Sequence, residues 1–101
     1  MNTGEIIKTL RKSKRLTQEQ LGEIVGVKKS AIAKYEKGRV ENLKRATIEK
    51  LANYFNVSPS YILGMQDESM DIMVKYKLLS PEHKKQVSQQ IDYYLSIDTE
   101  E

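Results

Sequence analysis

The chain has 101 residues, of which 31% are charged and 39% are hydrophobic, and its formal net charge is +3. A chain of this length and composition forms one domain with at most a small appendage, and it is too rich in apolar residues to be disordered throughout. It has no cysteine, which excludes disulfides, and no apolar run of the roughly 18 residues that a membrane helix needs. No signal-peptide pattern opens it, so we expect a cytoplasmic protein.

The spacing of apolar residues and the capping signals predict five short helices in residues 1–64. They cover residues 4–14, 17–25, 28–36 and 44–55, with a short fifth helix that opens with Ser58 as N-cap and Pro59 after it. The second and third helices meet at Gly26, which supplies the positive φ that a tight turn requires. Thr17 and Gln20 form a capping box at the start of the second helix.

Two short helices joined by a glycine turn form a helix-turn-helix motif. Gly22 lies four residues before the turn, where a small side chain allows the two helices to cross closely. Apolar residues occupy the positions that face inward in such a motif: Leu21, Val25, Val27, Ile32 and Tyr35. The combined pattern favours this motif over an ordinary helical hairpin in which the same residues recur by chance.

The stretch TQEQLGEIVGVKKSAIAKYEKG resembles the signature of Xre-type bacterial and phage regulators, which are relatives of the lambdoid phage repressors and Cro proteins. The resemblance runs over about two-thirds of the chain, and it departs at Gly22, where the family usually has alanine, and at Ile24, where the family is usually polar. It implies an all-α fold: a five-helix, phage-repressor-like helix-turn-helix domain in residues 1–64 that binds double-stranded DNA.

The distribution of charge agrees with a polyanionic partner for this domain. Residues 1–64 hold 13 lysines and arginines and six acidic residues, a net charge of +7, whereas residues 65–101 hold four and eight, a net charge of −4. A basic domain followed by an acidic appendage is typical of a nucleic-acid-binding domain, although basic residues also serve solubility alone.

In a helix-turn-helix motif, the N-terminal residues of the second helix reach base edges in the major groove. If Ile32 and Tyr35 face inward, the exposed side carries four polar residues: Lys28, Lys29, Ser30 and Lys34. Lysine donates to guanine O6 and N7, and serine serves either base type. We therefore expect the three lysines to contact guanines or phosphates, and Ser30 to discriminate less.

The resemblance implies further roles outside this helix. Gln18 would contact a phosphate and steady a side chain of the recognition helix, and the loop before the fourth helix would touch the DNA backbone through Arg39, Asn42 and Lys44. Glu41, in the same loop, would be repelled by phosphate, so only part of the loop is expected to touch DNA.

Arg11 and Glu36 match a pair that in the family joins the first helix to the end of the third. The implied role is structural, because a buried ion pair would hold the recognition helix at a fixed angle, and Arg11 would also be within reach of a phosphate. The alternative is two unrelated surface charges.

Residues 65–69 are polar and are predicted to be a linker, and residues 70–101 are predicted to form a C-terminal helical hairpin. The hairpin is too short to bury both of its apolar stripes alone. We expect it to pack on a second copy of the chain; packing on the first domain or on an antagonist protein are the alternatives. The candidate interface residues are Leu78, Leu79, Val87, Ile91, Tyr94 and Leu95.

No glycine-rich phosphate loop, nucleophile elbow or zinc motif occurs, and the single histidine, His83, has no companion ligands. We therefore expect no enzyme, no cofactor and no metal. The prediction is a sequence-specific DNA-binding transcriptional regulator, a phage- or mobile-element-type repressor that binds an inverted-repeat operator as a homodimer and responds to an antirepressor or other antagonist. The alternative is an antitoxin-like protein that neutralises a partner toxin and autoregulates its operon.

Overall fold

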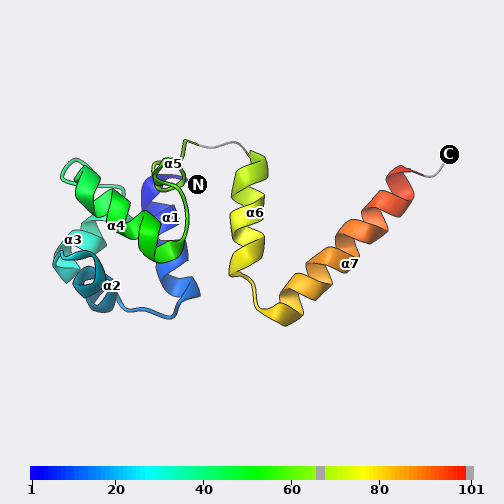
Figure 1. Ribbon diagram of the computed structural model, residues 1–101, viewed down its shortest axis with the longest axis horizontal. Coiled ribbons are helices and arrows are strands. Elements are labelled where there is room, and N and C mark those ends of the chain that lie inside the picture. Colours follow the sequence, from blue (N-terminus) through cyan, green and yellow to red (C-terminus); the bar gives the residue numbers. More distant parts are fainter. Residues whose placement is uncertain (66–67, 100–101) are drawn as a thin grey trace.

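The computed structural model describes residues 1–65 and 68–99, and the helices of these residues form a small bundle followed by two extending helices (Figure 1). In chain order they are α1 (Thr3–Ser13), α2 (Gln18–Val25), α3 (Lys29–Glu36), α4 (Arg45–Phe55), α5 (Pro59–Ile62), α6 (Glu68–Leu78) and α7 (Pro81–Asp98). The predicted fold class, an all-α helix-turn-helix domain with two C-terminal helices, is confirmed. Gln66 and Asp67 of the predicted linker, and Glu100 and Glu101, lie outside the described residues.

Local signals in the sequence fix where the bundle helices begin and end. The Thr17 hydroxyl accepts from the Gln20 N–H at 3.0 Å, and the Gln20 side chain accepts from the Thr17 N–H at 2.8 Å, which completes the capping box of α2. Gly26 ends α2 with φ +77°. Lys28 and Lys44 are N-caps rather than first helical residues, so α3 and α4 begin one residue later than predicted.

Twelve buried apolar side chains of α1–α5 form one core within the predicted domain: Ile6, Ile7, Leu10, Leu21, Val25, Ile32, Tyr35, Leu51, Ala52, Phe55, Tyr61 and Ile62. The α2–α3 crossing is tighter than the resemblance implies. A Cβ built at Gly22 would lie 2.6 Å from the carbonyl oxygen of Val27, so even the methyl group of the family's usual alanine requires the backbone to move. This departure from the family therefore accompanies a closer approach of the two helices.

The first C-terminal helix, α6, is docked on the bundle. The Tyr61 hydroxyl donates to the Asp71 carboxylate at 2.9 Å, and the half-buried Val74 and Leu78 pack against the core. Lys75 pairs with Asp71 at 2.8 Å. The helix begins at Glu68, before the end of the predicted linker, because a polar first turn has no apolar spacing that would indicate a helix in the sequence.

The second C-terminal helix, α7, diverges from α6 and runs away from the bundle (Figure 1). None of its 18 residues is buried. The predicted hairpin is thus open, with α6 packed on the bundle and α7 extended away from it. Most apolar side chains of α7 remain exposed along the helix, among them Ile91, Tyr94 and Leu95, whereas Val87 is half-buried.

Tyr61→Phe is expected to weaken the docking of α6 by about 1 kcal/mol, since it removes the hydrogen bond to Asp71. Burial, and secondly this hydrogen bond, raise the pKa of Tyr61 from 10.0 to about 12. Because the folded pKa is the higher one, the stabilisation is complete below pH 10 and is lost as the pH rises toward 12. Urea unfolding at pH 7 and pH 11 measures both effects; equal wild-type and variant stabilities at pH 7 would contradict the docking role.

Candidate nucleic-acid interface

Helix α3 presents one polar face to solvent. Ile32 and Tyr35 are buried at 0% and 5% exposure, which turns the other side of the helix outward. The exposed residues of that side are Lys28, Lys29, Ser30 and Lys34. No side chain caps the N-terminus of α3, so the positive end of the helix dipole faces solvent beside two lysines.

A recess of about 260 Å³ lies between α3 and the loop that precedes α4. Its polar and charged lining residues are Lys28, Ser30, Lys34, Arg39, Glu41 and Asn42. Five of the eight predicted DNA-contact residues therefore surround one concavity, which is lined by three basic side chains and one carboxylate. Lys29 and Lys44 are exposed outside this lining, at the N-termini of α3 and α4.

A hydrogen-bonded cluster centred on Glu36 holds the end of α3. Arg11 Nε and Nη2 donate to the two Glu36 carboxylate oxygens at 2.7 and 3.0 Å, and Arg11 Nη1 donates to the Leu16 carbonyl at 2.7 Å. The two charged side chains are 11% and 5% exposed. The hydrogen bond to Glu36 raises the pKa of Arg11 against the opposing effect of burial. A bidentate pair of this kind fixes both distance and orientation, and here it joins α1 to α3.

Gln18 belongs to the same cluster. Its amide nitrogen donates to Glu36 Oε1 at 3.2 Å, and its side chain is half-buried. The first residue of α2 thus contacts the last residue of α3, which is the steadying role that the family resemblance implies. Arg11 uses three of its five N–H donors on Glu36 and the Leu16 carbonyl, so two remain, and its contact with a phosphate stays a prediction.

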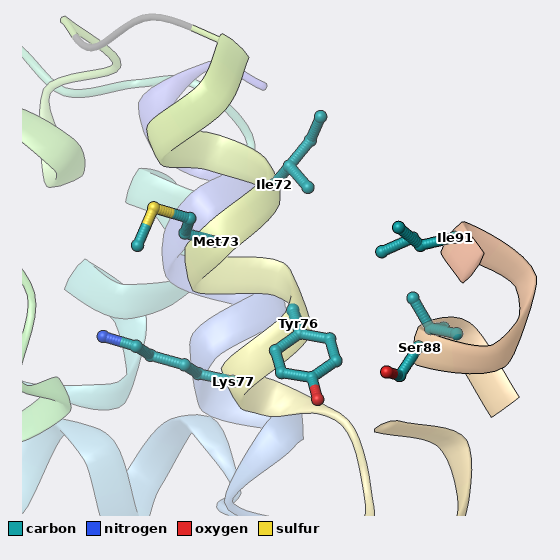
Figure 2. A pocket seen from close by; sticks show the side chains of 7 residues that line it. Ile72, Met73, Tyr76, Lys77, Ser88 and Ile91 are labelled. Carbon is teal, nitrogen blue, oxygen red and sulfur yellow. The ribbon is translucent and has the colours of Figure 1, made fainter. Parts of the chain in front are cut away.

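A second, apolar groove of about 430 Å³ separates α6 from α7. In Figure 2, Ile72 and Tyr76 of α6 point across it toward Ser88 and Ile91 of α7. Of the six predicted interface residues, Val87 and Ile91 line this groove, and Tyr94 and Leu95 lie exposed farther along α7. Leu78 instead packs on the core, and Leu79 is half-buried at the end of α6.

Two other kinds of site are absent from the described residues. No group of three or more histidine, cysteine, aspartate or glutamate side chains is arranged to hold a metal ion there. Nor does any helix in that part of the chain combine the length and the apolar character needed to cross a membrane.

A family model described as helix-turn-helix matches residues 7–62, which include every core residue except Ile6, the Glu36 cluster and the α3 face. The chain belongs to the Xre-type helix-turn-helix family. Its relatives include proteins named as HTH-type transcriptional regulators, and one of its structural neighbours is a repressor crystallised with a synthetic operator.

Two curated relatives show the range of proteins to which this helix-turn-helix chain is similar. YobD, an uncharacterized HTH-type transcriptional regulator of Bacillus subtilis, is 38% identical over 65 residues, which are 61% of this chain and 54% of YobD. The antitoxin PezA of Streptococcus pneumoniae is 33% identical over 75 residues, which are 74% of this chain and 46% of PezA. The chain thus spans about half the length of these curated relatives.

Two solved structures are also similar. The P22 c2 repressor, crystallised with a synthetic operator, matches with a TM-score of 0.60 and 30% identity over 65% of this chain and 98% of that chain. The SinR protein in its complex with the SinI protein matches with a TM-score of 0.55 and 27% identity, over 96% of this chain and 98% of that chain. The first comparison covers about the extent of the bundle, whereas the second extends over almost the whole chain.

Proposed function

We propose that this chain is a sequence-specific DNA-binding transcriptional regulator of the cytoplasm, and that it represses as a dimer on an inverted-repeat operator. The observation that carries the proposal is the exposed polar face of α3. This face is continuous with a recess that is lined by three basic side chains, Lys28, Lys34 and Arg39. The net charge of +7 in residues 1–64 adds long-range attraction to a polyanion. The likeness to the P22 c2 repressor, which was crystallised with its operator, supports the same role.

In the proposed complex, α3 lies in the major groove, and Lys28 and Lys29 approach base edges from its N-terminus. Lys34, one turn farther along, and Arg39 flank the same groove. Asn42 and Lys44 contact phosphates from the loop before α4, and the free N–H groups at the start of α2 receive a phosphate beside Gln18. The Arg11–Glu36 pair keeps the angle of α3 constant during binding. Occupation of a promoter then excludes polymerase sterically, which requires no catalysis.

The proposed dimer uses the open C-terminal helices. Nine large hydrophobic side chains of α6 and α7 are between 37% and 61% exposed: Met70, Ile72, Met73, Tyr76, Ile91, Tyr93, Tyr94, Leu95 and Ile97. The side of α7 that carries Ile91, Tyr94 and Leu95, together with Ile72 and Tyr76 of α6 across the groove, is the apolar surface available to a dimer. A two-fold dimer would cover this surface on both copies and would match the symmetry of an inverted repeat.

Lys29→Ala is expected to weaken binding to the preferred operator by about 1–3 kcal/mol, because the side chain is exposed at the N-terminus of the recognition helix, where base edges are read. The measurement is fluorescence anisotropy with a duplex enriched from a random library and with a scrambled duplex. Lys85→Ala, which removes the same charge from α7, is the matched control. Equal losses on both duplexes would assign Lys29 to phosphate contact and contradict base reading.

An antitoxin-like protein is the second candidate, favoured by the similarity to PezA and by the exposed apolar surface of α7. In that case, α6 and α7 would hold a partner toxin, and DNA binding would serve autoregulation. Co-expression with the product of the adjoining gene distinguishes the two roles. Relief of growth arrest by this chain would favour the antitoxin, whereas an adjoining gene without toxicity would favour the repressor.

A further inference from the structure

Glu41 carries the one carboxylate that lines the polar recess beside α3. Its neighbours in the lining include Lys28, Lys34 and Arg39, yet none of the ion pairs and side-chain hydrogen bonds found in the described part of the chain involves Glu41. The side chain is exposed. The recess therefore presents an unpaired anion among cations on the surface that the proposed function turns toward DNA.

A carboxylate in this place is unfavourable against most of the DNA surface. Phosphate oxygens repel it, and when DNA excludes water from the recess, the ionised group loses hydration without gaining a donor. Among the hydrogen-bonding groups of a duplex, base amino groups are the donors within reach of the major groove. Cytosine N4 is the amino group that glutamate and aspartate characteristically read there.

The neighbours of Glu41 complement this readout. Lys28 and Lys34 offer ammonium donors that suit guanine O6 and N7, and Glu41 offers an acceptor that suits cytosine N4. Guanine acceptors and the cytosine donor occur together in each C·G base pair, so a recess with both kinds of group suits C·G-containing sites. Thymine at the same position would present its O4 acceptor to the carboxylate and would repel it.

We propose that Glu41 is a specificity-determining residue, which accepts a hydrogen bond from the N4 amino group of a cytosine in the operator half-site. The inference depends on the proposed DNA-binding function and adds to it a base contact from outside the recognition helix. Glu41 thereby acts twice: it favours the cognate cytosine, and it weakens binding to sequences that present no amino group at that position, where the carboxylate stays unpaired beside the phosphates.

The test compares three full-length chains in selection from a random duplex library: wild type, Glu41→Ala, which removes the acceptor, and Glu23→Ala. The control removes the same charge from an exposed position of α2, so it reports the effect of net charge alone. In the duplex that the wild type enriches, each half-site cytosine is then replaced in turn by thymine, with the complementary change, and affinities are measured by anisotropy.

We expect one of these replacements to weaken the wild type and Glu23→Ala by about tenfold, and to weaken Glu41→Ala by less than about twofold. Glu41→Ala should also bind a scrambled duplex more tightly than either of the others. If Glu41→Ala enriches the same motif and loses as much at every cytosine, or gains equally on all duplexes, the inference is wrong while the proposed function stands. A wild type that enriches no motif overturns both.

Discussion

Ile91→Glu is expected to convert a dimeric chain to a monomer at micromolar concentration without unfolding it. Ile91 is 50% exposed and lies on α7, which contributes nothing to the buried core, so the folded monomer tolerates the charge. In the proposed dimer, each copy would bury one unpaired carboxylate. Because a buried charge without a partner is strongly unfavourable, two of them would prevent dimer formation. Sedimentation equilibrium of the two chains without DNA measures the change directly.

The same substitution should lower operator affinity by about 10²–10⁴-fold, because the second half-site is then no longer bound intramolecularly. Gln89→Glu is the matched control: it adds the same charge to α7, two residues earlier and therefore on the opposite side of the helix. If Ile91→Glu remains dimeric, or if Gln89→Glu dissociates equally, the apolar face of α7 is not the interface.

Arg11→Ala is expected to destabilise the bundle by about 3 kcal/mol or more. The substitution leaves Glu36, whose side chain is 5% exposed, with a buried charge and only the Gln18 amide as a side-chain donor. It also removes the donor to the Leu16 carbonyl. Urea unfolding followed by circular dichroism gives the free energy of unfolding.

The double variant Arg11→Met/Glu36→Leu removes both charges of the ion pair and replaces them with apolar side chains. It should be less destabilised than Arg11→Ala, since it removes both charges and leaves neither one buried alone. The losses of stability of the single variants Arg11→Met and Glu36→Leu are measured alongside. If the loss in the double variant equals their sum, the two residues are not coupled. A stable double variant with weakened operator binding would assign the pair its proposed role of orienting α3.

The bundle is predictable from sequence because its signals are local. The Thr17 capping box, Gly26 and the apolar spacing lie within a few residues of the structure that they determine. The docking of α6 is different in kind. The Tyr61–Asp71 hydrogen bond joins separate helices. The spacing of apolar residues does not indicate which polar side chains of two helices will meet. The sequence places Leu78 at an outer interface for the same reason, because an apolar stripe does not indicate which neighbour it packs against.

The candidate site divides in the same way. The outward face of α3 follows from the inward positions of Ile32 and Tyr35, since a helix with two fixed inner residues has its outer ones determined. The position of Glu41 does not follow, because loop residues have no repeating geometry. The sequence indicates only that phosphate would repel the negative charge of Glu41. The fold shows that Glu41 lines the recess together with Lys28 and Lys34.

Selection of the full-length chain against a random duplex library, followed by affinity measurement on the enriched and scrambled duplexes, tests the central claim most directly. We predict one inverted repeat, with half-sites about 10 base pairs or a multiple of that distance apart, bound at least about 10³-fold more tightly than scrambled DNA. Equal affinity for all duplexes, with no enriched sequence, would contradict sequence-specific recognition by α3.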